Sequence, residues 1–341
     1  MLRRHFLAGL ALALKRDRLD SAVALVEKFA QSGKVRAAAL LVRQGDFELA
    51  RGFGAAKADT VFLLASITKP MTAAGVMILR DRKQLSLDDT VRRYIPEFHG
   101  GDRDQITIRH LLTHTSGLPD MLPENTDLRR RHAPLKDFVA GACHTPLLFK
   151  PGSEVRYQSM GILLASEIAE RITRKPFRDF LRAELFEPLG MRASSLDLGG
   201  RAIRDTAQSQ VTGDDDWNWN SPYWRNLGVP WGGAHSNARD VAAFTEFFRN
   251  PRKAIFKPET AREMITNQNA GLKTPWGIGW MLRRFGKSCS AETYGHGGST
   301  GTSTWHDPAS GITCVILTTW PAAESQKPVL TPVCDLVSQA A

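Results

Sequence analysis

The sequence predicts an α/β plus α fold, in which an antiparallel sheet flanked by helices is built from both ends of the chain around a mainly helical insertion. Strand-like segments gather at the two ends of the 341-residue chain, whereas helical spacing dominates its middle. Each end also carries two strand-like segments joined by a strong turn signal. We expect a sheet domain from residues 18–65 and 270–341, a helical domain from 66–269, and an N-terminal extension or signal-like segment over 1–17.

The N-terminal elements follow from local patterns. Residues 19–29 have apolar side chains at helical spacing, and residues 35–42 and 47–53 predict two strands around a turn at Gly45. Residues 61–64 are expected to form a short apolar strand or a segment that leads into the next helix. A helix with one apolar face is expected next, because apolar side chains recur there at i, i+3, i+4, i+7 and i+8. These side chains belong to Met71, Ala74, Gly75, Ile78 and Leu79.

The rest of the chain is predicted in the same way. Helices are expected in the middle of the chain, at 108–112, 161–173, 177–186 and 240–248. Strands are expected near its end, at 276–282, 301–306 and 312–319, followed by a closing helix over 328–338. Four tryptophans crowd the loop 214–233, where they either line an acyl or aromatic pocket or pack the helical part over the sheet.

Composition narrows the classes of function. The formal net charge is +10, but the basic residues are spread out apart from the run 129–132, and neither zinc-finger spacing nor an RNP-like aromatic motif occurs. We therefore expect no nucleic-acid partner. No apolar stretch is long enough to span a bilayer. The four cysteines have no C-x-x-C spacing, and they are too few for disulfide bonds to hold together a chain of this length.

The first residues leave the compartment open. Arg3-Arg4 precedes an apolar run from Phe6 to Leu14, which resembles the front of a twin-arginine export signal. Against this interpretation, the charged run 15–18 follows at once without a cleavage site. The other interpretation is that these residues are the first turns of a helix, so bacterial cytoplasm and periplasm both remain open.

One pattern points directly to chemistry. Ser66-Ile67-Thr68-Lys69 is the only S-x-x-K in the chain, and residues three apart on a helix share a face, so the lysine amine can reach the serine hydroxyl. Lys69 serves as a base only if its pKa falls toward neutrality, which burial among the apolar residues 62–65 and Met71 would achieve. The alternative for an isolated pattern is an ordinary serine cap beside a solvated lysine.

The surrounding segments resemble the class C β-lactamase-like serine hydrolases, a family of β-lactamase and penicillin-binding-protein type with esterase-like members. The matching segments occur in family order and span residues 19–319. They are 62–74 (FLLASITKPMTAA), 85–91 (LSLDDTV), 106–119 (ITIRHLLTHTSGLP), 151–154 (PGSE), 188–191 (PLGM) and 232–240 (GGAHSNARD). The resemblance implies a β-lactamase/transpeptidase-like fold with the active site in the cleft between its two parts. It also implies that Ser66 is the nucleophile and Lys69 its base.

The second family motif, Tyr-x-Asn, corresponds to Tyr157-Gln158-Ser159. By resemblance, Tyr157 shares the acid/base role with Lys69 and protonates the leaving group, whereas the alternative is a half-buried structural tyrosine. Ser159 stands at the position of an asparagine that in β-lactamases helps to bind the amide of the substrate. We predict a substrate-binding role for Ser159, and the departure from asparagine weakens the β-lactam interpretation.

The third family motif, Lys-Thr-Gly, corresponds to His296-Gly297-Gly298, for which we predict substrate binding. A histidine holds a carboxylate more weakly than a lysine does, and only when protonated. The glycines allow a substrate to approach the backbone. By resemblance, the oxyanion hole consists of the N–H groups of Ser66 and Ser299.

Two other patterns suggest different chemistry. Residues 297–301 match G-x-S-x-G, which would make Ser299 an elbow nucleophile, but a strand rather than a helix is expected after it. His110 and His114 have the spacing of a zinc motif, but Leu111 stands where its glutamate should be. We expect a structural pair there, and neither a metal nor an organic cofactor.

Together these residues predict a hydrolase that cleaves an ester or amide of a small molecule through an acyl-serine intermediate, with carboxylesterase as the favoured activity. The alternatives are a β-lactamase or D-amino-acid peptidase, an acyltransferase, and a non-catalytic binding module that keeps the fold. The natural substrate and the oligomeric state stay open.

Overall fold

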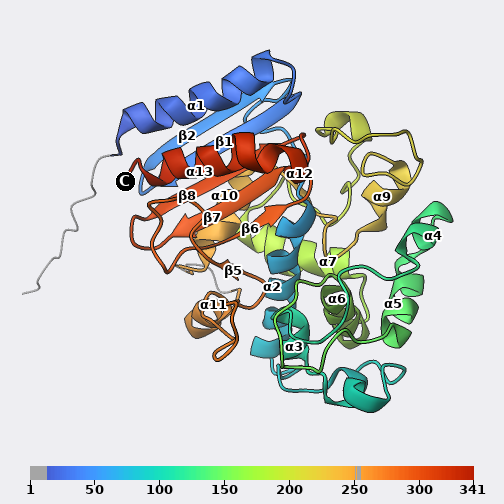
Figure 1. Cartoon of the computed structure of the whole chain (residues 1–341). Coiled ribbons are helices and arrows are strands. Elements are labelled where there is room, and N and C mark those ends of the chain that lie inside the picture. The colour runs from blue at the N-terminus through green and yellow to red at the C-terminus, as the bar shows by residue number, and fades with distance from the viewer. Residues whose placement is uncertain (1–13, 250, 252–254) are drawn as a thin grey trace, which may run out of the picture.

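The computed structural model describes residues 14–249, 251 and 255–341, and it has a six-stranded antiparallel sheet formed by strands from both ends of the chain (Figure 1). The strand order is β2-β1-β8-β7-β6-β5. In that order the strands are Phe47–Gly54, Ala37–Gln44, Ile312–Thr318, Thr302–Asp307, Tyr294–Gly298 and Met281–Leu282. The predicted α/β plus α fold is confirmed.

Helices cover both faces of this sheet (Figure 1). Helices α1 (Arg16–Gln31) and α13 (Thr331–Ser338) pack on one face, and α10 (Ala238–Phe247) packs on the other. Alternate residues of β1 therefore enter different clusters: Ala38, Leu40 and Val42 join α1 and α13, whereas Ala39 and Leu41 join the core of the helical part. Burial on both faces explains why β1 and β8 are continuous apolar runs.

Helix α2 (Thr68–Asp81) runs through the interior, and every residue from Thr68 to Leu79 is buried. The prediction of a single apolar face is wrong, because the polar side chains of the other face are buried as well. Thr72 shows how this is possible, since its hydroxyl donates to the carbonyl of Pro230 at 2.6 Å. Gly75 allows the closest packing, because a Cβ there would lie 2.7 Å from the Leu181 side chain.

The other helices have the following bounds. The helical part contains α3 Ile108–Leu112, α4 Asn125–Arg130, α5 Leu135–His144, α6 Met160–Thr173, α7 Phe177–Leu181, α8 Glu187–Leu189 and α9 Pro222–Leu227. Later in the chain are α11 Pro258–Met264 and α12 Ala322–Ser325, and a two-stranded ladder joins β3 Phe62–Leu63 to β4 His235–Ser236. The helices predicted at 108–112, 161–173 and 240–248 are confirmed within two residues. The helix predicted at 177–186 is α7 followed by a π-helical turn, Arg182–Phe186.

The hairpins at both ends are confirmed, but the strand predicted at 276–282 is not. Only Met281–Leu282 forms a strand there. Gly279 has φ +80°, and the Gly277 N–H donates to the carbonyl of Trp280 at 2.9 Å, so this segment closes into a tight loop. The closing helix predicted at 328–338 is a π-helical turn followed by α13.

Residues 1–13 of the signal-like segment lie outside the described residues, and α1 already begins at Arg16. The domain boundaries at 65/66 and 269/270 stay a prediction. Within the described ranges, no helix combines the length and the apolar character needed to cross a membrane.

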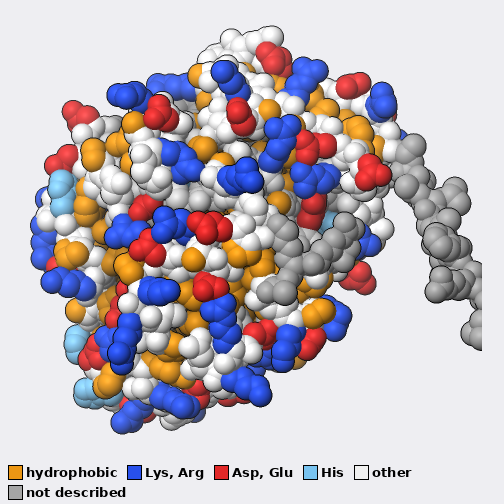
Figure 2. Space-filling model, turned by 180° about the vertical axis from the view of Figure 1, so that it is seen from behind, with side chains coloured by type: hydrophobic (Ala, Val, Ile, Leu, Met, Phe, Trp, Pro, Cys, Tyr) orange, Lys and Arg blue, Asp and Glu red, His pale blue; other side chains and the backbone are white. Residues whose placement is uncertain are grey.

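The surface charge is mixed. On the face seen in Figure 2, Lys and Arg side chains alternate with Asp and Glu side chains. The basic run is also largely partnered: Arg130 pairs with Asp127 at 2.8 Å, Arg131 pairs with Asp137 at 3.2 Å, and Arg129 stacks on two tryptophan rings. This arrangement leaves no concentrated basic patch at residues 129–131.

Candidate active site

Ser66 occupies a strained turn between β3 and α2. It lies in a 3₁₀ turn, Ala65–Ile67. Ala65 has φ +49°, an unusual value for a residue with a side chain. Thr68 fixes the turn, because its hydroxyl donates to the Ala65 carbonyl at 2.6 Å and accepts from the Ala234 N–H at 3.0 Å. Within residues 61–70, Ser66 alone is not fully buried. The turn thus leaves the Ser66 side chain partly exposed.

Lys69 lies one helical turn from Ser66 and is deeply buried, with 1% of its surface exposed. Its Nζ lies 3.1 Å from Ser66 Oγ and 3.0 Å from the carbonyl oxygen of Trp231. Burial lowers the pKa of Lys69 to about 7, and the charge of Asp120 opposes this shift weakly. A substantial fraction of the amine is therefore neutral near pH 7 and able to take a proton from Ser66.

Tyr157 closes the other side of the pair. Lys69 Nζ lies 4.6 Å from the centre of the phenol ring. Burial raises the pKa of Tyr157, while its hydrogen bond with the Ser66 hydroxyl acts in the opposite direction. The phenol therefore keeps its proton at neutral pH and can act as a proton donor. The structure brings together the three residues for which catalytic roles were predicted.

His114 supports the tyrosine, a role that the sequence did not reveal. Its ring centre lies 4.8 Å from that of Tyr157 and 4.5 Å from that of Trp276. Its Nδ1 accepts a hydrogen bond from the backbone N–H of Gln158 at 3.2 Å. Burial holds the pKa of His114 well below its usual value, so the ring is neutral. His110 instead caps α3, so the two histidines have separate structural functions.

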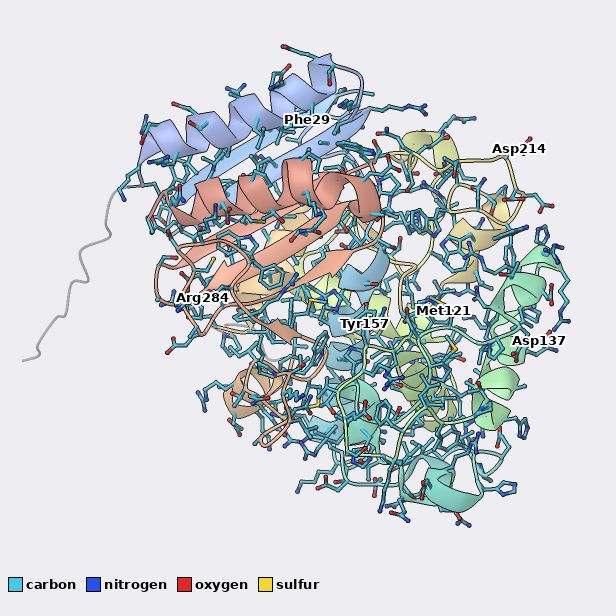
Figure 3. All side chains as sticks on the ribbon, in the orientation of Figure 1. Phe29, Met121, Asp137, Tyr157, Asp214 and Arg284 are labelled. Carbon is cyan, nitrogen blue, oxygen red and sulfur yellow. The ribbon has the colours of Figure 1, made fainter. Side chains whose placement is uncertain are left out.

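Ser159 lies at the start of α6 and is 1% exposed. Its hydroxyl donates to Asp120 Oδ1 at 2.6 Å, and these residues are 39 positions apart in the chain. Figure 3 labels Tyr157 and also Met121, the neighbour of Asp120, in the region between the sheet and the helical part. The predicted substrate-binding residue is thus tied to an acidic side chain that the sequence analysis did not single out.

Strand β6 forms the facing edge of the site. It contains His296, Gly297 and Gly298, and Ser299 follows in the turn to β7. In the described part of the chain, no hydrogen-bond acceptor is found for the N–H of Ser299. Ser66 is the second residue of its turn, and the first N–H groups of a helix have no acceptor within the helix. Both amides are thus available for the predicted oxyanion hole, which stays a prediction.

Gly298 fixes the distance between β6 and the turn that carries Ser66. A Cβ at this position would lie 2.2 Å from the Leu64 carbonyl oxygen, 2.2 Å from Thr302 Oγ1 and 3.2 Å from Ala65 Cβ. Since the first contact is with backbone, a larger residue must push the strand away from the turn.

We expect Gly298→Ala to lower the free energy of unfolding by about 2–4 kcal/mol and to reduce hydrolytic activity by about a hundredfold. Gly297→Ala is the matched control for stability, because a Cβ there would meet nothing closer than the Thr302 carbonyl oxygen at 3.7 Å. Denaturant unfolding of both variants tests this. Equal stabilities would contradict the prediction.

His296 is buried and neutral. Its Nδ1 lies 2.7 Å from the carbonyl oxygen of Gly297, so that nitrogen carries the proton, and its buried Nε2 has no partner in the described residues. Burial and the neighbouring Lys69 lower the pKa of His296 to about 3. His296 therefore does not provide the positive charge that a lysine at this position would offer to a carboxylate.

The tryptophans of the 214–233 loop divide into two groups. Trp224 and Trp231 are buried and pack on each other, and the carbonyl of Trp231 holds Lys69. Trp217 and Trp219 line a cavity of about 380 Å³ whose wall includes Pro321. The packing role is therefore seen for Trp224 and Trp231, whereas the cavity beside Trp217 and Trp219 shares no lining residue with the site around Ser66.

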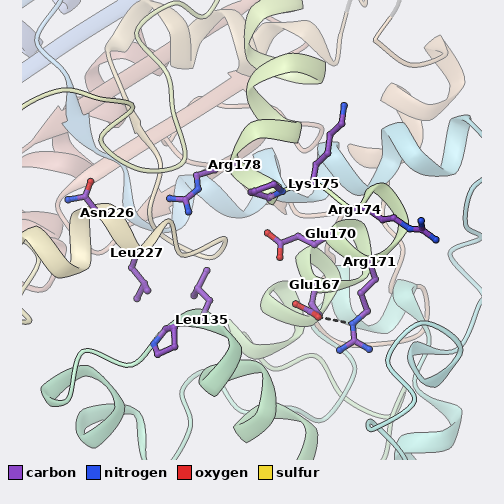
Figure 4. Close-up of a pocket in the computed structure, with 11 residues that line it drawn as sticks. Leu135, Glu167, Glu170, Arg171, Arg174, Lys175, Arg178, Asn226 and Leu227 are labelled. Carbon is purple, nitrogen blue, oxygen red and sulfur yellow. Dashed lines mark hydrogen bonds and ion pairs between the residues drawn. The ribbon is translucent and has the colours of Figure 1, made fainter.

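A second cavity, of about 730 Å³, lies on the helical part between α6–α7 and the end of α9 (Figure 4). Four basic residues line it, but Arg171 pairs with Glu167 at 2.7 Å and Arg178 pairs with Asp197 at 3.0 Å. It shares no lining residue with the site around Ser66.

The structure also bears on the G-x-S-x-G match, on the metal-like spacing and on the cysteines. Strand β7 begins at Thr302, so no helix follows Ser299 and the elbow interpretation is unsupported. Residues 14–249, 251 and 255–341 contain no cluster of three His, Cys, Asp or Glu side chains suited to a metal ion. All four cysteines are free and buried.

Comparisons with known proteins agree with this geometry. The model of the Beta-lactamase family matches residues 22–332. Esterase EstB of Burkholderia gladioli is 30% identical over 353 residues, covering 90% of this chain and 87% of the relative. Penicillin-binding protein 4* of Bacillus subtilis (strain 168) is 30% identical over 191 residues, covering 52% of this chain and 42% of the relative.

Two solved structures show the same fold. EstCE1, described as a hydrolase with promiscuous acyltransferase activity, has a TM-score of 0.78 at 21% identity, with 95% of this chain and 99% of that chain covered. A family VIII carboxylesterase has a TM-score of 0.73 at 19% identity, with 89% and 92% covered. With the family match and the esterase relative, these findings establish that the chain belongs to the Beta-lactamase family and is a serine hydrolase.

Proposed function

We propose that the protein is a carboxylesterase that works through an acyl-serine intermediate, with Ser66, Lys69 and Tyr157 as its catalytic residues. The contact of 3.1 Å between Ser66 Oγ and the buried Lys69 amine is the observation that carries this proposal. A base with a pKa of about 7 activates a serine near neutral pH.

The first half of the reaction forms the acyl enzyme. Ser66 Oγ attacks the ester carbonyl carbon and its proton passes to the neutral amine of Lys69. The N–H groups of Ser66 and Ser299 stabilise the negative oxygen of the tetrahedral intermediate. Tyr157 gives its phenol proton to the departing alkoxide and regains one from the Lys69 ammonium, so the alcohol leaves neutral.

The second half releases the acid. A water molecule attacks the acyl carbon, and its proton passes to the neutral amine of Lys69 by way of the Tyr157 phenol, which gives its own proton to Lys69 as it takes one from the water. The tetrahedral intermediate collapses, Ser66 Oγ regains a proton, and the carboxylic acid departs.

Two features favour an ester over a β-lactam. His296 is neutral at physiological pH, so it does not supply the charge that would hold the carboxylate of a β-lactam. Ser159 stands in place of the family asparagine, and its hydroxyl is engaged by Asp120. The similarity to Esterase EstB over most of both chains supports the same choice.

The test compares kcat/KM for a short-chain nitrophenyl ester with kcat/KM for a chromogenic cephalosporin. We expect the ester to be preferred by at least about a hundredfold, because the substrate groups that a β-lactamase grips lack partners here. A clear preference for the cephalosporin would refute the esterase proposal while leaving the serine mechanism intact.

A further inference from the structure

An exposed acidic side chain is hydrogen-bonded to a residue of the proposed active site. Asp120 belongs to the loop that follows α3, and it is exposed. It is nevertheless held in place, because the buried hydroxyl of Ser159 donates to its Oδ1 at 2.6 Å. In the described part of the chain, no Lys, Arg or His forms an ion pair with this carboxylate within 4.0 Å. Its charge is therefore fixed in position and not neutralised by the protein.

The position of Asp120 relative to the reacting groups follows from two observations. Ser159, its hydrogen-bond partner, lies only two residues after Tyr157. The negative charge of Asp120 also acts, after the larger effect of burial, on the pKa values of both Lys69 and Tyr157. A carboxylate that reaches both groups lies close enough to interact with a substrate held between them.

The rest of the site balances this charge only in part, since Lys69 is partly protonated near pH 7. His296, where the family motif places a lysine, is neutral. Arg156, near Tyr157 in the chain, points its guanidinium at Glu154, at 3.3 Å. Beside Asp120 the Met121 side chain is 39% exposed, which offers an apolar contact next to the charge. A fixed carboxylate attracts an alkylammonium group, and an exposed thioether offers an apolar contact to its alkyl substituents.

We propose that Asp120 is a specificity-determining residue that selects esters carrying a cationic group, such as a quaternary ammonium or an amine, and disfavours esters carrying an anion. This inference rests on the proposed esterase function, for which it names the substrate class. Asp120 takes no part in bond making and acts on binding alone.

Isosteric substrates measure the effect directly. Acetylcholine and neohexyl acetate differ in charge on the alcohol side but have the same shape. Ethyl betaine and ethyl tert-butylacetate do the same on the acyl side. The quantity measured is the ratio of kcat/KM for the charged ester to that for the neutral ester, by acid release in a pH-stat. Any change in the pKa of Lys69 affects both members of a pair and cancels in the ratio.

For at least one pair we expect the ratio to be about tenfold higher in the wild-type enzyme than in Asp120→Asn, with the change in KM. Raising the salt from about 0.01 M to about 1 M should also lower the wild-type ratio, because the Debye length falls from about 30 Å to about 3 Å. Asp127→Asn is the control for loss of a surface charge and should keep the wild-type ratio, since Asp127 pairs with Arg130 on α4.

The outcomes separate the two proposals. If the wild-type enzyme hydrolyses nitrophenyl acetate and both pairs give equal ratios in wild type and Asp120→Asn, the role of Asp120 is refuted and the esterase stands. If Asp127→Asn lowers the ratio as much, net surface charge and not Asp120 is responsible, which also refutes it. If no ester is hydrolysed and a fluorophosphonate does not label Ser66, both proposals fall together.

Discussion

Ser66→Ala is expected to reduce ester hydrolysis by about 10⁴- to 10⁶-fold and to abolish labelling by a fluorophosphonate probe. The reason is geometric, because Ser66 carries the hydroxyl that lies within hydrogen-bonding distance of the Lys69 amine. Intact-mass spectrometry after labelling gives the result without any assumption about the natural substrate.

Ser299→Ala is the informative control. In the structure Ser299 lies in the turn between β6 and β7, and its proposed contribution is a backbone N–H that the substitution leaves in place. It should therefore still be labelled. Labelling lost only in Ser299→Ala would identify an elbow-type nucleophile instead. Absence of labelling in the wild-type protein would favour a non-catalytic binding module.

Lys69→Met is expected to lower kcat/KM for esters by about 10³-fold or more while making the protein more stable. Methionine fills the volume of the lysine stem but has no amine to accept the Ser66 proton. In the wild-type enzyme, kcat/KM should fall about tenfold per pH unit below about 7, as Lys69 becomes protonated, and level off above it. The variant should lack this acidic limb.

The gain in stability follows from the same lowered pKa. The pKa of Lys69 drops from 10.5 to about 7 on folding, so the unfolded chain binds the proton more tightly than the folded chain does. The resulting destabilisation, up to about 5 kcal/mol, is complete below pH 7 and disappears as the pH rises toward 10.5. Methionine removes this cost but leaves the Trp231 carbonyl without its donor, which offsets about 1–3 kcal/mol.

We therefore expect Lys69→Met to raise the melting temperature at pH 6, with the advantage gone by pH 10. Lys136→Met is the matched control, because Lys136 is exposed on α5 and its replacement removes a lysine without relieving burial. A Lys69→Met protein that is less stable than wild type at pH 6 would show that the buried amine stabilises the fold.

The sequence predicts the features that local spacing determines. Ser66 and Lys69 are three residues apart, so helical geometry alone brings their side chains together. The hairpin of β1 and β2 follows equally from two strand-like segments on either side of a turn at Gly45, which has φ +56°. The order of the family motifs then adds Tyr157 and His296, whose proximity no local pattern specifies.

Other parts of the site depend on contacts between distant loops, which periodicity does not describe. Asp120 reaches Ser159 from 39 residues away, and the carbonyl that holds Lys69 belongs to Trp231, 162 residues later. The neutrality of His296 depends on complete burial, which is a property of the packed fold. A strand was predicted where the structure has the tight loop at Gly279, because the spacing of apolar residues does not reveal that a glycine adopts a positive φ.

The central position of β1 and β8 in the sheet has a consequence for biosynthesis. Ala38 pairs with Thr318 and Arg43 with Thr313, so these neighbouring strands are separated by most of the chain. Gly298, at the end of β6, also packs closely against the turn that carries Ser66. A ribosome-bound chain that already contains Ser66, Lys69 and Tyr157 still lacks the strands that complete the sheet and the proposed oxyanion hole. Hydrolytic activity must therefore begin only after the last strands have emerged, and such long-range pairing favours slow folding.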